Sequence, residues 1–334
     1  MRLKDNPVAK IKDPGDVLIK IKKVGICGSD VHYYTLGRIG DQIIKYPFVV
    51  GHEASGIIQE TGNAVKNLKP GDRVAIDPAL PCWKCDQCLA GRHHTCRNLK
   101  FLGNPGQAEG ALSEFIVMPE TSCYSVPENL NMEQAVISEP LAIGLYSIKK
   151  SDITGNKKIG ILGFGPIGMS VFLSARYYNI KDIFVTDKIN ERLNIAASSG
   201  ASWTGNPDKT NIVKDILNLE PLQLDVVFEC CGKQEAVDQA IELLKPGGKL
   251  IIIGIPDFNY WSFSVDKTRR KEITIINVRR QVECTQLALE LMAGGKINVE
   301  RMITHHFDFE DTEKAFEMVS NYKDGVMKAI VDID

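Results

Sequence analysis

The chain has 334 residues, with 42 acidic and 40 basic side chains and a formal net charge of -2 at pH 7, so it lacks the basic field that gathers nucleic acid or anionic lipid. Its length exceeds what one hydrophobic core usually supports, which predicts two domains, and its 44% hydrophobic content suits a packed globular protein. No apolar run approaches a membrane span and the first residues lack the apolar core of a signal peptide, so we expect a cytoplasmic protein without nucleic acid or membrane partners.

The first 127 residues are predicted to form short strands separated by turns rich in Gly and Pro. Strands are expected at 16–26, 54–62, 72–78 and 114–119. This pattern of short strands and turns is typical of an irregular all-β unit.

After a helical stretch at 132–150, the pattern changes to a regular alternation of strands and helices. Strands are expected at 158–164, 182–187, 224–230 and 249–255, and helices at 166–178, 190–198 and 234–244. Apolar strands alternating with amphipathic helices predict an α/β domain with a doubly wound parallel sheet, which we place at 140–276. The tail contains helical stretches and a closing strand at 326–333, and we expect it to pack back on the first unit.

A glycine-rich turn joins the first of these strands to its helix. Gly163, Gly165 and Gly168 fit G-x-G-x-x-G, with Pro166 and Ile167 opening the helix between them. Such glycines let the backbone turn tightly and approach a pyrophosphate at a helix N-terminus, which predicts a Rossmann dinucleotide site. The alternative is a sheet of this kind that binds no nucleotide, and the strand-turn-helix frame disfavours it.

The next strand ends at Asp187, 24 residues after Gly163. A carboxylate at this position accepts hydrogen bonds from the adenosine ribose and repels a 2′-phosphate, so we favour NAD over NADP. Arg192, five positions further on, leaves NADP open.

Four of the nine cysteines lie within fifteen positions. They are Cys82, Cys85, Cys88 and Cys96. Their spacing lets four thiolates converge on one tetrahedral zinc ion, and a site with no position left for water is structural. The alternative is four free surface thiols. His93 and His94 in the same loop are expected to be exposed, although either replaces a cysteine ligand if the register differs.

A second set of possible ligands is spread along the chain. Cys27, His52, Glu53 and Glu139 each lie at the edge of an apolar segment. Thiolate, imidazole and carboxylate bind zinc while leaving a place for water or substrate. Taken singly, each residue is more often part of a core, as a small buried Cys or a satisfied structural His.

The motifs together resemble the zinc-containing medium-chain alcohol dehydrogenases, and most closely their polyol branch. They are GICGSDVHYY, GRIGD, GHEASG, PGDRVAI, the four-cysteine loop, EPLA, GFGPIG and VFECCG. The resemblance implies a GroES-like β-barrel catalytic domain at 1–139 and 277–334, the inserted Rossmann domain at 140–276, an active site in the cleft joining them, and a homotetramer or homodimer.

The resemblance also implies roles for the second set of ligands. Cys27 and His52 match catalytic zinc ligands, Glu53 matches a further ligand of polyol dehydrogenases, and Glu139 matches a glutamate that holds the zinc-bound water. Glu53 and Glu139 exchange roles between states in this interpretation, which leaves the direct ligand open.

Three polar residues after Cys27 match further positions of the family. Ser29 and His32 match a hydroxyl and an imidazole that pass the alcohol proton outward. Asp30 matches an acid that orients the zinc-bound histidine, although capping a turn explains it equally well.

The chain departs from the polyol branch at NVRRQVE, where sorbitol-type enzymes carry Arg-Tyr-x-Asn. Arg280 is retained, but Gln281 replaces the tyrosine. Arg279 or Arg280 suits a carboxylated sugar such as an aldonate, because guanidinium pairs with carboxylate in two parallel hydrogen bonds. Contact with NAD or with a neighbouring subunit explains these arginines as well.

We therefore expect a zinc- and NAD-dependent dehydrogenase that oxidises a secondary alcohol of a small polyhydroxy substrate to a ketone. An aldonate, an inositol or threonine is the alternative substrate for the same chemistry. A binding or regulatory protein that uses its zinc loop is the alternative from another class, but the loop carries few positive charges and does not explain the glycine turn.

Overall fold

The computed structural model describes residues 1–333 and divides into two compact units. Unit 1 comprises Met1–Glu139 and Thr285–Asp334, and unit 2 comprises Pro140–Cys284. Sequence analysis placed the divisions after 139 and after 276. The second compact unit extends to Cys284, and just beyond its last strand the Val278 N–H still donates to the Ile252 carbonyl at 2.9 Å. The predicted domain bounds stay a prediction.

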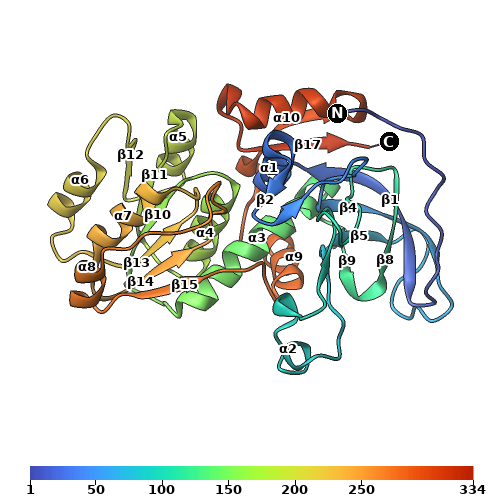
Figure 1. Ribbon diagram of the computed structural model, residues 1–334, viewed down its shortest axis with the longest axis horizontal. Helices are drawn as coiled ribbons and strands as arrows, with labels where there is room; N and C mark the ends of the chain where they lie inside the picture. Colours follow the sequence, from blue (N-terminus) through green and yellow to red (C-terminus); the bar gives the residue numbers. More distant parts are fainter. Residues whose placement is uncertain (334) are drawn as a thin grey trace. The chain divides into compact units, whose positions relative to one another are not determined.

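Unit 1 is built on a seven-stranded sheet (Figure 1). Its strands are β1 (Asp16–Gly25), β4 (Glu53–Thr61), β5 (Arg73–Ile76), β8 (Phe115–Pro119), β9 (Cys123–Ser125), β16 (Ile303–Asp308) and β17 (Lys328–Asp332). The order is β16-β17-β1-β4-β5-β9, and β8 also pairs with β1. Two small ribbons are formed by β2 (Arg38–Ile39) with β3 (Gln42–Ile43), and by β6 (Ala79–Leu80) with β7 (Lys100–Phe101). The helices are α1 (Gly28–Leu36), α2 (Asp86–Leu89), α9 (Thr285–Ala293) and α10 (Thr312–Ser320), and α3 (Met132–Ser151) begins here.

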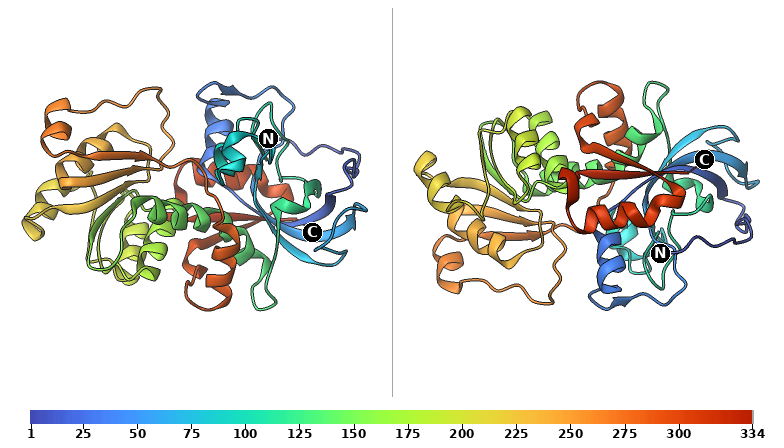
Figure 2. Two further views of the ribbon diagram at one scale, coloured as in Figure 1. Left: turned by 90° about the horizontal axis from the view of Figure 1, so that it is seen from below. Right: turned by 90° about the horizontal axis from the view of Figure 1, so that it is seen from above.

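The long strand β1 organises this unit because it pairs on both sides. Its first half pairs with β8 and its second half with β17, while β4 pairs along its whole length. Val17, Ile19 and Ile21 lie on one face of β1 and belong to the core, and Lys20 and Lys22 on the other face are only partly buried, as expected for a sheet with one buried face. The pairing of β17 with β1 confirms that the tail returns to the first unit (Figure 2).

Unit 2 contains a six-stranded parallel sheet with the order β12-β11-β10-β13-β14-β15. Its strands are β10 (Lys158–Leu162), β11 (Asp182–Thr186), β12 (Trp203–Gly205), β13 (Leu224–Glu229), β14 (Leu244–Ile252) and β15 (Thr274–Asn277). Its helices are α4 (Pro166–Tyr177), α5 (Asn190–Ser198), α6 (Ile212–Leu219), α7 (Gln234–Leu243) and α8 (Val265–Arg270). Helices lie on both faces of the sheet (Figure 2), as predicted for a doubly wound domain. The central strands, which the sequence predicted, are almost wholly buried, whereas the short edge strands β12 and β15 were not predicted.

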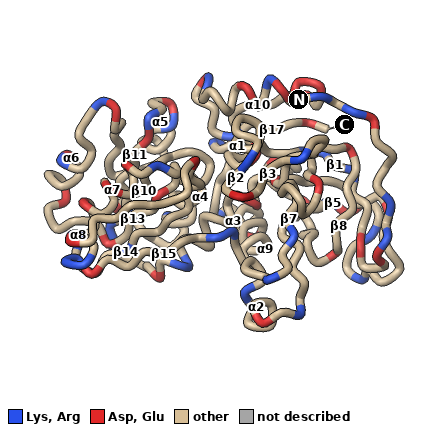
Figure 3. The backbone as a smooth tube through the Cα atoms, in the orientation of Figure 1, with Lys and Arg blue, Asp and Glu red and all other residues tan. Residues whose placement is uncertain are grey.

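Acidic and basic residues are interspersed along both units (Figure 3). Among residues 1–333, none of the helices combines the length and the apolar character that crossing a membrane requires.

Candidate active site

The four predicted thiols converge in the loop that contains α2. Cys82, Cys85, Cys88 and Cys96 place their sulfur atoms within 4.8 Å of one another. The Sγ of Cys85 lies 3.6 Å from that of Cys88 and 3.8 Å from that of Cys96. Sulfur atoms about 3.8 Å apart are what a tetrahedral zinc with Zn–S bonds near 2.3 Å requires. The four thiols therefore fit a structural zinc.

The backbone of this loop is arranged to support negatively charged sulfur. The N–H groups of Cys82 and Asn98 donate to the Sγ of Cys96 at 3.2 and 3.4 Å. Backbone hydrogen bonding, from Lys84 above all, lowers the pKa of Cys82 to about 6. Arg97 closes the loop through two hydrogen bonds to Asp86, at 2.5 and 2.9 Å. The surroundings therefore favour the thiolate at Cys82 and Cys85, whereas burial raises the pKa of Cys88 to about 12, a shift that a bound cation would offset.

A second group of ligands forms where β1 ends and β4 begins. Cys27 follows β1 as the N-cap residue of α1, and His52 and Glu53 lie at the start of β4. Antiparallel pairing of Gly25 with Glu53 brings the two segments together, and the three ligand atoms lie within 4.8 Å of one another. One thiolate, one imidazole and one carboxylate fit a zinc ion and leave a fourth position open. The sequence prediction that these three residues meet is confirmed.

The carboxylate of Asp30 contacts both chain segments that carry the ligands. Its Oδ1 lies 3.2 Å from Nδ1 of His52 and accepts the Gly51 N–H at 3.2 Å, while its Oδ2 accepts the Cys27 N–H at 3.3 Å. Burial alone would lower the pKa of His52, but the nearby Asp30 carboxylate and Cys27 raise it well above its ordinary value. The surroundings of the imidazole therefore favour a positive charge, which a divalent cation supplies.

Glu53 has a cationic partner that the sequence analysis did not find. The ammonium of Lys328 lies 2.7 and 2.5 Å from the two carboxylate oxygens of Glu53, and each side chain is 1% exposed. Burial would lower the pKa of Lys328, but Glu53 raises it, so the pair is ionic. The available signal was one lysine in the otherwise apolar run VMKAIV of the closing strand.

Glu139 lies in α3 immediately before Pro140 and is buried. Among residues 1–333, its carboxylate is outside the group formed by Cys27, His52 and Glu53. Burial raises the pKa of Glu139 to about 7, although the positive charge at His52 opposes the shift. Glu53 is therefore the carboxylate that lies beside Cys27 and His52. Glu139 lies near enough for the charges of His52 and Glu53 to shift its pKa.

Ser29 and His32 lie on α1 just after Cys27, and both are partly exposed. Arg280 and Gln281 belong to unit 2. Arg280 adopts a left-handed backbone with φ 55°, and Gln281 is buried and accepts the Cys284 N–H at 2.9 Å. The proton relay and the substrate contact proposed for these positions remain predictions.

The glycine turn in unit 2 has the shape expected of a dinucleotide site. Gly163 leaves β10 with φ 95°, and Gly165 is the N-cap residue of α4, which begins with Pro166 and Ile167. A Cβ on Gly168 would lie 2.0 Å from the Gly163 carbonyl oxygen, so only glycine permits this closeness of helix and strand. Helix N-terminal N–H groups are thereby presented to an anion.

Asp187 and Arg192 border the same turn. The carboxylate of Asp187 accepts the Phe164 N–H at 2.6 Å and the Ile189 N–H at 2.8 Å. The guanidinium of Arg192 lies over Gly165, where an added Cβ would be 3.2 Å from Nη1. The structure therefore brings both predicted cofactor residues to the turn.

The turn after β13 packs against the glycine turn and is held by Glu229. Oε1 of this fully buried side chain accepts the N–H groups of Cys231 and Gly232 at 2.8 and 2.6 Å, and burial raises the pKa of Glu229. A Cβ on Gly163 would lie 2.8 Å from the Cys231 Cβ, which shows how closely the two turns approach.

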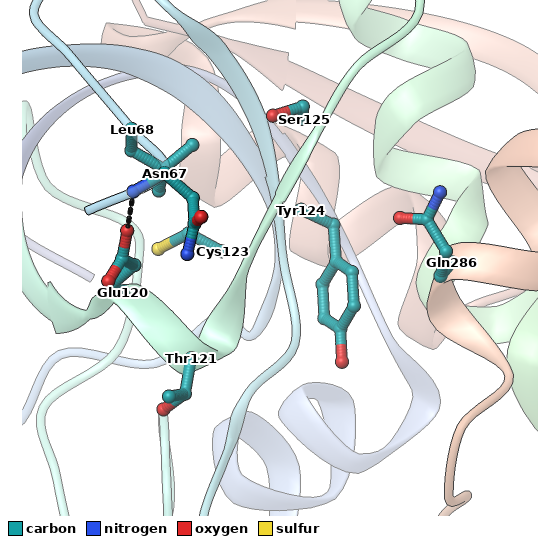
Figure 4. A pocket seen from close by; sticks show the side chains of 8 residues that line it. All are labelled: Asn67, Leu68, Glu120, Thr121, Cys123, Tyr124, Ser125 and Gln286. Atoms are coloured by element: carbon teal, nitrogen blue, oxygen red, sulfur yellow. Dashed lines mark hydrogen bonds between the residues drawn. The ribbon is translucent and has the colours of Figure 1, made fainter. Parts of the chain in front are cut away.

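A separate pocket of about 310 Å³ in unit 1 shares no residue with either cysteine-containing cluster (Figure 4). It is lined by Asn67, Leu68, Glu120, Thr121, Cys123, Tyr124, Ser125 and Gln286. Oε1 of Glu120 accepts the N–H groups of Lys66 and Asn67, so this side chain stabilises the loop that forms one wall of the pocket.

Comparison with known proteins agrees with the two units and their clusters. The family model of the alcohol dehydrogenase GroES-like domain matches residues 13–128, and that of zinc-binding dehydrogenases matches residues 166–294. The chain therefore belongs to the zinc-binding medium-chain alcohol dehydrogenase family, with a GroES-like domain and a Rossmann-type domain.

Several curated relatives align over most of this chain. It is 34% identical to a probable D-xylulose reductase A of Aspergillus fumigatus, over 100% of this chain and 94% of that protein. Identity is 34% to a sorbitol dehydrogenase of Arabidopsis thaliana, over 91% and 85%, and 35% to an L-idonate 5-dehydrogenase of Vitis vinifera, over 91% and 84%.

Solved structures also share the whole fold. A zinc-binding dehydrogenase of Sinorhizobium meliloti bound to NADP aligns with TM-score 0.88 and 29% identity, over 97% of this chain and 93% of that one. An Escherichia coli alcohol dehydrogenase complexed with NADH aligns with TM-score 0.87 and 29% identity, over 99% and 94%.

Proposed function

We propose that this dehydrogenase oxidises a secondary alcohol of a polyol or sugar-derived substrate to a ketone, with NAD as hydride acceptor. The main support is the cluster of Cys27, His52 and Glu53, because three ligands leave one position of a tetrahedral zinc for substrate. Zinc held there supplies Lewis acidity toward the alcohol oxygen.

Residues around the cluster handle the proton that the alcohol loses. Ser29 and His32 on the partly exposed face of α1 pass it outward. Glu139 is the second group suited to this task, because a carboxyl with a pKa of about 7 exchanges protons readily near neutral pH. It is also the alternative ligand when Glu53 releases the metal.

NAD is favoured over NADP by Asp187, whose charge disfavours a 2′-phosphate. The carboxylate borders the turn that would receive the cofactor, with Arg192 beside it. Both cofactors occur among similar solved structures, one with NADH and one with NADP. The preference is therefore proposed from this chain's own residues.

The substrate class is proposed from relatives whose names refer to xylulose and sorbitol. The relative named for L-idonate keeps an aldonate as the alternative, and Arg280 is the cation that would pair with its carboxylate. An inositol or threonine would require the same chemistry. We further propose that the protein forms a homodimer or homotetramer, which light scattering tests. We also propose that it is located in the cytoplasm, which cell fractionation tests.

An NAD-reduction screen of the zinc-loaded protein tests this function. The compounds are pentitols, hexitols, inositols, aldonates and threonine, and we expect a polyol to give the highest kcat/KM. Cys27→Ser should abolish turnover and lower the zinc content from about two to about one per chain. Cys123→Ser, which changes a buried thiol outside both clusters, is the matched control. Turnover by metal-free Cys27→Ser protein would contradict the proposal, and a zinc-loop binding protein would reduce no NAD with any compound.

A further inference from the structure

Lys328 is one of the largest fully buried side chains in the described part of the chain, and it is charged. Its ammonium donates to both oxygens of Glu53 and, at 3.1 Å, to the carbonyl oxygen of Ile26. An ammonium has three N–H donors, so these contacts use all of them. The side chain is thus held in a defined position.

One partner of Lys328 precedes a metal ligand in the chain, and the other is itself a ligand. Ile26 precedes Cys27, and Glu53 follows His52. Lys328 begins β17, which pairs with the end of β1, so one lysine bridges the two segments that carry all three ligands.

The strand register leaves the Glu53 carboxylate little freedom. Gly25 pairs with Glu53 on one side and with Ile330 on the other. A Cβ on Gly25 would lie 2.4 Å from Oε2 of Glu53, so the carboxylate occupies the space above this glycine. The ammonium of Lys328 bonds to both oxygens of this carboxylate, which lies within 4.8 Å of the Cys27 thiol and the His52 imidazole.

A carboxylate held in this way has two cations competing for it. Without metal, Lys328 compensates the buried charge of Glu53, whose isolation would be costly. With metal bound, the ammonium and the divalent ion share the same carboxylate and repel each other across a short distance in a poorly solvated region. The lysine therefore weakens the hold of the carboxylate on the metal while keeping it in place.

We propose that Lys328 is a positioning residue that holds Glu53 beside Cys27 and His52 and, by sharing its carboxylate, limits how tightly this centre binds its metal. A carboxylate–metal contact weakened in this way is easily exchanged, which suits a centre where Glu53 and Glu139 alternate. The inference rests on the proposed catalytic metal site, but it concerns metal affinity and needs neither substrate nor NAD.

The test is zinc affinity, measured by competition with a chromophoric chelator in the full-length protein. The variants are Lys328→Met, Lys328→Arg, Glu53→Gln and the double variant Lys328→Met/Glu53→Gln. Cys27→Ser protein supplies the background, since its remaining zinc belongs to the four-cysteine loop. We expect Lys328→Met to bind zinc about tenfold more tightly or better, Lys328→Arg to stay within about threefold of the parent, and Lys328→Met to have no effect when Glu53 is Gln.

Thermal unfolding with and without zinc gives a second measurement. Zinc should stabilise Lys328→Met more than the parent protein, because the metal then replaces the missing counter-charge. A Lys328→Met protein that folds only with zinc supports the proposal in the same way. If it folds under neither condition, the neutral but hydrogen-bonding Lys328→Gln carries the same expectation.

Two results would overturn the proposal. If Lys328→Met is destabilised equally with and without zinc, and its zinc affinity is unchanged, the pair of Lys328 and Glu53 is purely structural. Weaker zinc binding in Lys328→Met shows that the lysine assists the metal and does not compete with it. Failure of the polyol screen changes neither readout, so the two proposals fail independently.

Discussion

Nδ1 of His52 lies 3.2 Å from Oδ1 of Asp30, a carboxylate that is 1% exposed. A carboxylate there fixes Nδ1 as the donor of the imidazole, so Nε2 is the nitrogen that faces a metal. Because Asp30 also accepts the N–H groups of Cys27 and Gly51, it orients a ligand side chain and the backbone of the ligand segments together. The sequence left its role open between orienting the histidine and capping a turn, and the structure shows that it does both.

Asp30→Asn should therefore weaken zinc binding at the cluster of Cys27, His52 and Glu53. An amide keeps the size of the side chain but loses the charge that favours a cationic centre, and loss of such a partner typically costs 10- to 100-fold in metal affinity. Chelator competition measures the change. Asp72→Asn, which alters a partly exposed residue paired with Lys69, is the control, and equal zinc affinity in both variants would contradict the assigned role.

Cys96→Ser should remove the zinc of the loop and leave the other zinc in place. The Sγ of Cys96 accepts two backbone N–H groups and lies 3.8 Å from that of Cys85, so its loss opens the loop as well as the metal site. We expect about one zinc per chain by metal analysis and tryptic cleavage after Lys84 or Arg92 accelerated about tenfold or more. Cys123→Ser should retain both zinc ions and resist trypsin. Unchanged metal content in Cys96→Ser would exclude the site.

The elements that the sequence predicted well are those with a strong periodic signal. The buried strands β10, β11 and β13 and the helices α4 and α5 start within a residue or two of where their patterns begin, whereas α6 was not predicted. Helix α1 was missed because only Asp30 and Tyr33 of its residues are buried, and because its capping box has Cys27 in place of Ser or Thr. The left-handed Gly37 at its end was the remaining signal.

The candidate site was predictable where its residues carry recognisable neighbours in the chain. Cys27, His52 and Glu53 come together because β1 and β4 pair, which a hairpin-rich pattern makes plausible from sequence. Lys328 could not be found in this way, since its contact with Glu53 spans 275 positions and depends on β17 lying beside β1. Strand order within a sheet is a tertiary property that alternation of side chains does not encode.

Asp187→Asn should shift the cofactor preference toward NADP. The two oxygens of Asp187 accept the N–H groups of Phe164 and Ile189 separately, so the amide keeps an acceptor for only one of them, and it removes the charge that repels a 2′-phosphate. We expect the ratio of kcat/KM for NADP over NAD to rise about tenfold or more, the order expected for one poorly screened charge contact. Asp182→Asn, at the exposed opposite end of β11, should leave the ratio unchanged. An unaltered ratio in Asp187→Asn would mean that the ribose is recognised elsewhere.

Glu229 should make the stability of the protein fall as the pH rises. Burial raises its pKa in the folded state above 4.5, so above that pH the unfolded chain releases the proton while the folded protein retains it. Unfolding therefore becomes easier with rising pH until the folded pKa is reached. Glu229→Gln cannot titrate but keeps an oxygen for the N–H groups of Cys231 and Gly232. Its free energy of unfolding relative to the parent should increase between about pH 5 and 7 in urea titrations. A difference that stays constant over this range would mean that Glu229 is ionised in the folded protein as readily as in the unfolded chain.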